Sequence, residues 1–159
     1  MSAGDQILSA PQSGSLPVNV FPSPDSVSFD PTAYIALPAI GVTSTVVSFV
    51  VPEGYHGVIR RMGNVFVGSG WTEGSGSLVW QLLANGAVIR NYDNVVSSLG
   101  AVNNPAYLGG GGGILVYEQQ LVILQVNNVS LVVGGSSAGG RLSGWFFPKW
   151  RMPDDTSVF

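Results

Sequence analysis

The fold is decided by the stretch Ser77–Asn91, SLVWQLLANGAVIRN. Its first half places Leu78, Trp80 and Leu82 on one face of an expected strand. Asn85-Gly86 follows, and both residues tolerate the positive φ angles of a type I′ turn. The stretch therefore predicts a β-hairpin whose first strand carries Trp80 into the core.

A second pair of apolar runs has the same form. Leu121–Val126 and Val129–Val133 flank Asn127-Asn128. A two-residue turn at the asparagines pairs the two runs so that their apolar residues share one face. The sequence predicts a second hairpin at this place.

Similar signals recur on both sides of the two hairpins. Further strands are expected at Tyr34–Ile40, Ser44–Val51, Gly57–Val67, Ile114–Tyr117 and about Arg141–Phe147, with a bulge near Arg60, Arg61 and Gly63. No stretch keeps helical periodicity for more than two turns. About eight short strands predict an all-β chain folded as a single antiparallel β-sandwich.

Composition divides the chain into three parts. Residues 1–31 hold five of the ten prolines, and proline at this density prohibits helix interiors. We expect an extended N-terminal arm over residues 1–31, a β-sandwich domain over 32–150 and a C-terminal tail over 151–159. An arm without its own core is expected to lie on a neighbouring subunit. The apolar residues that we expect it to bring to that contact are Val18, Val20 and Phe21.

Charge is scarce in this chain. Only 9% of its 159 residues are Asp, Glu, Lys or Arg, against roughly a quarter in an ordinary soluble domain. A surface this neutral predicts that other protein covers much of it. The net charge is −3 and the six basic residues are scattered, so nucleic acid is not expected as a partner. No apolar segment is long enough to indicate a membrane partner, and without a secretory signal we expect synthesis in a cytoplasm.

The sequence contains no recognisable catalytic or metal-binding set. His56 is the only histidine, it lies in an expected turn, and no Gly-x-Ser-x-Gly motif accompanies it. The acids that could form a glycosidase pair are isolated in the sequence: Glu53, Glu73, Asp93 and Glu118. There is no cysteine, and no cluster has metal-ligand spacing. We expect no enzyme activity, no metal and no cofactor.

Aromatic residues outside the expected core are the other candidate contact residues. Trp71 lies in a glycine-rich loop, and Tyr107 lies in the long connection before five consecutive glycines. Alternation along the last strand turns Trp145 and Phe147 outward if the residue between them points inward, and Trp150 follows shortly after. Exposed aromatic side chains anchor interfaces, so these five residues complete the candidate interface.

Together these features resemble the virion proteins of tailed bacteriophages. The resemblance is carried by the proline-punctuated arm, the turns Val51-Pro52-Glu53-Gly54 and Asn85-Gly86, and a Gly/Ser/Asn-rich body without cysteine. More narrowly, the chain resembles small jelly-roll subunits that decorate the head or build the collar, spikes or fibre bases. It implies a trimeric or pentameric homo-oligomer whose arm lies on a neighbour or on the major capsid or connector protein. No catalytic residues are implied.

Three functional hypotheses follow from the sequence. The first is a non-enzymatic structural subunit of a virion that assembles into a symmetric homo-oligomer. The alternative is a carbohydrate- or receptor-binding module of a phage fibre or tip, with Trp71, Tyr92 and Tyr107 as stacking platforms for a glycan. The third is a sandwich hydrolase, which requires a carboxylate or His56 in turnover.

Overall fold

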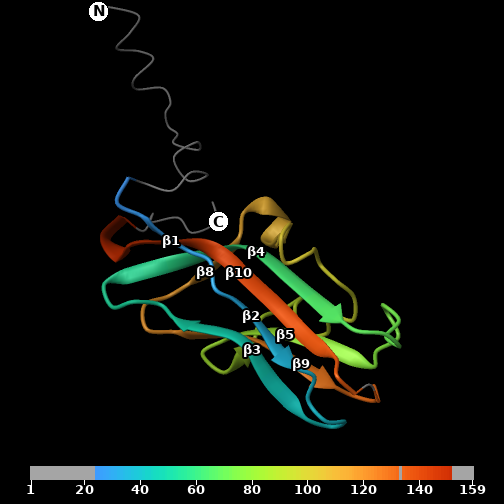
Figure 1. Cartoon of the computed structure of the whole chain (residues 1–159). Helices are drawn as coiled ribbons and strands as arrows, with labels where there is room; N and C mark the ends of the chain where they lie inside the picture. Colours follow the sequence, from blue (N-terminus) through green and yellow to red (C-terminus); the bar gives the residue numbers. More distant parts are fainter. Residues whose placement is uncertain (1–23, 133, 152–159) are drawn as a thin grey trace, which may run out of the picture.

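Two antiparallel β-sheets packed face to face make up the described part of the chain (Figure 1). The computed structural model describes residues 24–132 and 134–151. Within these ranges there is no α-helix, only the short 3₁₀ turns η1 (Gly109–Gly111) and η2 (Lys149–Arg151). The predicted all-β sandwich is confirmed.

Sheet A is built around two long strands. Its members are β1 (Val27–Phe29), β2 (Thr32–Ala36), β4 (Tyr55–Val67), β7 (Ala106–Tyr107), β8 (Ile114–Val116) and β10 (Ser137–Pro148). β10 pairs with β4 over its whole length, β1 and β2 pair in succession with the other edge of β10, and β7 and β8 pair with the other edge of β4. Sheet A is therefore four strands wide, because β1 and β2 share one edge position and β7 and β8 share the other.

Sheet B has one strand in each position. In spatial order it contains β3 (Thr43–Val50), β9 (Leu121–Asn128), β5 (Leu78–Ala84) and β6 (Ala87–Val88). The chain crosses between the sheets after β2, β3, β4, β6, β8 and β9, and a hairpin within one sheet joins only β5 to β6. Two sheets of four positions connected in this order form a jelly roll.

The apolar core lies between the two sheets. Trp80 in β5 is its largest fully buried side chain, and Leu78 and Leu82 beside it are also 0% exposed, as the alternation predicted. Met62 and Leu142 extend the same cluster from sheet A. Burial of side chains of this size stabilises the fold by about 1.5–3 kcal/mol each.

The hairpin predicted at Asn85-Gly86 is confirmed. Leu83 pairs with Val88 across the turn. Asn85 and Gly86 have φ angles of 52° and 81°, which a type I′ turn requires. The second strand is shorter than predicted, because β6 ends at Val88.

The hairpin predicted at Asn127-Asn128 is wrong. β9 continues through both asparagines and lies between β3 and β5, so both of its edges are already paired. Asn128 is 1% exposed, and its side chain binds the carbonyl oxygens of Pro38 and Leu131 and the N–H of Leu131. The asparagine fixes the following loop from inside the protein instead of forming a turn.

β4 contains the predicted bulge. The register with β10 shifts by one residue at Gly144, which pairs with Ile59, and Arg60 has no residue opposite it. A Cβ atom on Gly144 would lie 1.8 Å from the carbonyl oxygen of Val58, so only glycine fits beside the bulge. The extra residue brings Arg60 and Arg61 to one hollow on the face of sheet A that points away from sheet B.

The last residues of the predicted arm belong to the sandwich of this chain. β1 pairs with β10, and the Phe29 ring lies with its centroid 4.5 Å from that of Phe146 and 4.6 Å from that of Phe49. This part of the edge of β10 is therefore occupied by the same chain and not by a neighbour. Val18, Val20 and Phe21 lie outside the described residues.

The long connection between β6 and β8 is fixed to the sheets. The fully buried Asn64 in β4 accepts a hydrogen bond from the N–H of Leu99 at 2.8 Å and donates one to the carbonyl oxygen of Ser97 at 3.1 Å. Leu108 is 1% exposed. These contacts hold β7 against β4 and so position Tyr107.

Gly144→Ala is expected to lower the free energy of unfolding by about 3 kcal/mol, the upper end of the usual cost of overpacking. The added methyl group overlaps the carbonyl oxygen of Val58. Urea unfolding followed by tryptophan fluorescence measures the loss. Gly134→Ala is the control, because a Cβ atom there meets no atom within 4 Å. An equal loss in both variants would contradict the steric explanation.

Candidate functional site

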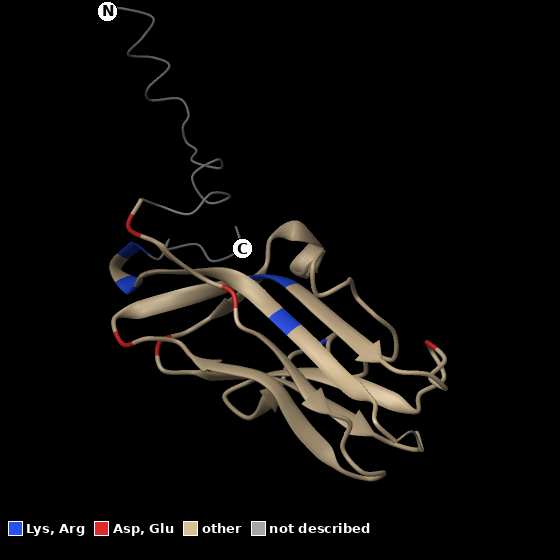
Figure 2. Ribbon diagram, viewed as in Figure 1, with Lys and Arg blue, Asp and Glu red and all other residues tan. Residues whose placement is uncertain are grey.

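The charged residues that lie in described strands all belong to sheet A. The strands of sheet B contain no Asp, Glu, Lys or Arg. The strands of sheet A contain three such residues, which are Arg60 and Arg61 in β4 and Arg141 in β10 (Figure 2). Every carboxylate in the described part of the chain lies outside the strands. The charge carried by the described strands is therefore entirely positive and lies in sheet A.

The three arginines line one hollow on the outer face of sheet A. Its volume is about 450 Å³. β10 and β4 form its floor, β7 contributes one wall, and β1 with the residue after it contributes the other. We call it the arginine groove and define it by Ser28, Asp30, Arg60, Arg61, Tyr107, Arg141, Ser143 and Trp145.

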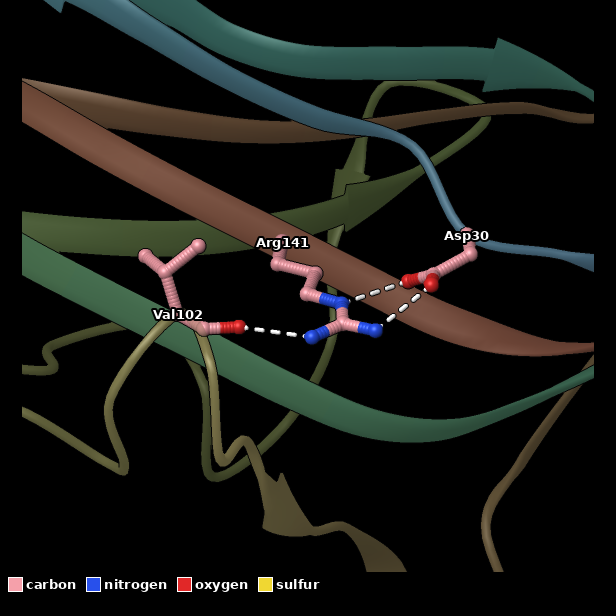
Figure 3. A network of polar contacts seen from close by, with 3 residues as sticks. All are labelled: Asp30, Val102 and Arg141. Carbon is pink, nitrogen blue, oxygen red and sulfur yellow. Dashed lines mark hydrogen bonds and ion pairs between the residues drawn. The ribbon is translucent and has the colours of Figure 1, made fainter.

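Arg141 is fully engaged by the chain itself. Its Nε and Nη2 each donate to the carboxylate of Asp30 at 2.6 Å, and its Nη1 donates to the carbonyl oxygen of Val102 at 2.8 Å (Figure 3). The hydrogen bonds from Arg141 lower the pKa of the Asp30 carboxyl group, and the same contact raises the pKa of Arg141. Arg141 thus fixes two loops across the face of β10 and neutralises the carboxylate of Asp30 in the groove.

Arg60 and Arg61 both contact the ring of Tyr107. The guanidinium carbon of Arg61 lies 4.3 Å from the ring centroid, and its Nη2 donates to the Tyr107 hydroxyl. The guanidinium carbon of Arg60 lies 5.4 Å from the Tyr107 centroid and 5.8 Å from the Trp145 centroid. The Arg60 side chain makes no hydrogen bond or ion pair with any residue that the structure describes. Its N–H donors are thus free to bind an anion.

Two of the predicted contact residues meet in this groove. Tyr107 is 55% exposed, and the half-buried Trp145 comes from a strand far away in the sequence. The sequence did not point to the arginines as a candidate site. Its only signal for them was the broken alternation at Arg60 and Arg61, which indicated a bulge but not a site.

The other described candidates lie outside the groove. The half-buried Trp71 packs on the core, with its ring centroid 5.5 Å from that of Trp80. Phe147 is on the outer side of sheet A but only 6% exposed, whereas Trp150 in η2 is 71% exposed. Tyr92 packs against the core and its hydroxyl accepts a hydrogen bond from the glycine-rich loop.

A second polar cluster surrounds His56, which lies in β4 and not in the turn that the sequence predicted. Its Nδ1 accepts a hydrogen bond from the N–H of Glu118 at 3.1 Å. The Glu118 carboxylate accepts hydrogen bonds from the N–H of Gly54 and, at 2.9 Å, from Nζ of Lys149. Burial lowers the pKa of His56, and the hydrogen bonds from Gly54 and Lys149 lower the pKa of Glu118. These hydrogen bonds join β4 to its neighbouring loops.

Metal ligands are not gathered in the described ranges, where no group of three or more His, Cys, Asp or Glu side chains could hold an ion. Among residues 24–132 and 134–151, no helix is long and apolar enough to cross a membrane.

No protein-family model matches the sequence, and no curated protein matches it at a significant level. Function has to be inferred from the geometry of the chain.

The stability of the fold is expected to fall on acidification in two steps. Because the pKa of His56 is below its ordinary value of 6.5 in the folded state, the unfolded chain takes up this proton first, and the free energy of unfolding decreases as the pH falls below that value. Glu118 and Asp30 have lowered pKa values, so a second loss begins near their ordinary values of 4.5 and 3.8 and continues below them.

Thermal unfolding as a function of pH measures both steps. His56→Gln removes the titrating ring, so this variant should lose the first step and keep the second. A wild-type Tm that does not change between about pH 7.5 and about pH 5.5 would contradict the account of His56.

Proposed function

We propose that this chain is a non-enzymatic structural subunit of a viral particle that assembles with copies of itself into a symmetric homo-oligomer. The type that we propose is a bacteriophage head-decoration, collar or spike subunit, trimeric or pentameric, made in the host cytoplasm and located in the virion. The part of the predicted arm that precedes β1 would dock it to the major capsid or a connector protein. The jelly-roll order of the strands supports the proposal, because this architecture is common among capsid proteins.

The observation that carries the proposal is the outer face of sheet B. We call it the uncharged face and define it by the outward residues Thr43, Thr45, Ser48, Val50, Val79, Gln81, Leu83, Val88, Leu121, Ile123, Gln125 and Asn127. Val50 and Leu121 pair across β3 and β9 and are 55% and 40% exposed. An exposed sheet face with apolar side chains and no charge is unusual on a protein that remains alone in water.

The composition of the uncharged face suits a contact between copies. Interface cores are depleted of charged residues, because burying an unpaired charge is costly. In a symmetric assembly each residue near the axis also meets its own copies, so a charge there would repel itself. Neither cost arises on this face.

Polar side chains on the uncharged face are already ordered. Nε2 of Gln125 donates to Oε1 of Gln81 at 2.8 Å, and Nε2 of Gln81 donates to the carbonyl oxygen of Asp93 at 3.0 Å. Side chains that are held before association lose less conformational entropy when they are buried. The uncharged face therefore has polar side chains that are already ordered before another copy binds.

Leu121→Asp is expected to convert the oligomer into a monomer, because it places one carboxylate per copy in the contact. Sedimentation equilibrium measures the mass, and circular dichroism verifies that the variant is folded. Val132→Asp is the matched control, since Val132 is 82% exposed and lies outside the face, and it should keep the wild-type mass. A wild-type chain that stays monomeric at micromolar concentration would contradict the proposed assembly.

A second candidate function is a carbohydrate- or receptor-binding module, and the arginine groove favours it. Among the three stacking platforms suggested by the sequence, Trp71 and Tyr92 pack against the core, whereas Tyr107 is 55% exposed. Tyr107 lies in a groove that also contains Trp145 and Arg60, whose side-chain N–H groups bind no described residue.

A further inference from the structure

We propose that the arginine groove binds a saccharide that carries a carboxylate, with Arg60 holding the carboxylate and Tyr107 and Trp145 contacting the sugar ring. The inference rests on the second candidate function and names its ligand class. It does not depend on assembly through the uncharged face, which belongs to the other sheet.

Arg60 is suited to a carboxylate by its fixed position and its free donors. Its guanidinium carbon contacts two rings, 5.4 Å from the Tyr107 centroid and 5.8 Å from the Trp145 centroid. A guanidinium held in this way loses little freedom when it binds, and its planar fork matches the two oxygens of a carboxylate. Arg61 hydrogen-bonds to Tyr107 and contacts the same ring.

The charge balance inside the groove favours an anion. Among the described residues, Asp30 is the only carboxylate that lines it, and Arg141 already binds both of its oxygens. These two charges cancel. Arg60 and Arg61 remain, adjacent in the sequence and on the same side of the sheet because of the bulge. An anion between them relieves the repulsion of two like charges.

The remaining groups of the groove fit a sugar. Aromatic rings bind an apolar face of a ligand by stacking, and Tyr107 offers a ring that is 55% exposed. Ser28 and Ser143 add hydroxyl groups on the same hollow, which can exchange hydrogen bonds with sugar hydroxyls. The volume of about 450 Å³ is within the range of small-ligand sites.

The position of the groove disfavours peptides and nucleic acids. Extended peptides bind where a strand edge has free backbone groups, but the floor is made of β10 and β4, which have paired neighbours on both sides. Nucleic acid needs many cations along its phosphate backbone. Only two arginines of this groove lack a carboxylate partner among the described residues.

Isothermal titration calorimetry on the full chain tests the proposal with two matched probes. One is an oligosaccharide of glucuronic acid and N-acetylglucosamine, and the other is the same oligosaccharide with each carboxyl group reduced to an alcohol. The acidic probe is expected to bind at least about tenfold more tightly, and Arg60→Gln should remove about that factor. Arg90→Gln is the control, because Arg90 is exposed and lies outside the groove.

Each of the other outcomes identifies which idea fails. Equal binding of the two probes, lost in Tyr107→Ala, overturns the carboxylate inference but keeps the saccharide-binding function. Unchanged binding in Arg60→Gln also overturns the inference. If neither this acidic probe nor a sialylated oligosaccharide binds, both the inference and the second candidate function fail. Tighter binding of an aspartate-rich peptide or of inorganic phosphate assigns the groove to another ligand class and overturns the proposal.

Discussion

The pairing of β10 with β4 is the interaction on which the rest of the structure depends. It forms the middle of sheet A, and every other strand of that sheet pairs with one of these two. Because Gly144 has no side chain, the ladder accommodates a bulge at Arg60. Strict alternation would send two consecutive residues to opposite faces. The bulge instead keeps Arg60 and Arg61 together, so the chemistry of the groove follows from one register shift.

The two outer faces of the sandwich differ in kind. All three charges that lie in strands are on sheet A, and the strands of sheet B contain none (Figure 2). A ligand that binds in the arginine groove would not compete with a copy that covers the uncharged face. The few charges in the strands are therefore unevenly distributed between the two outer faces. The uncharged face of sheet B is suited to association, whereas the outer face of sheet A carries three arginines in fixed positions.

The sequence predicted those features of the fold that depend only on residues close to one another along the chain. The turn at Asn85-Gly86, the burial of Trp80 and the bulge near Arg60 each follow from a short stretch. Asn127-Asn128 was predicted wrongly because the same dipeptide suits a turn or a buried position, and the choice depends on two strands pairing with β9. The arginine groove could not be predicted either. Tyr107 and Trp145 meet only because β7 and β10 both pair with β4.

The central claim is that another copy of the chain covers the uncharged face, and thiol reactivity tests it most directly. The chain contains no cysteine, so Ser48→Cys introduces a single thiol on this face and Val132→Cys introduces one outside it. At concentrations where the protein is assembled, the account predicts that the thiol at position 48 reacts slowly, the thiol at position 132 reacts fast, and dilution removes the difference. Equal reaction rates in the assembled protein would contradict it.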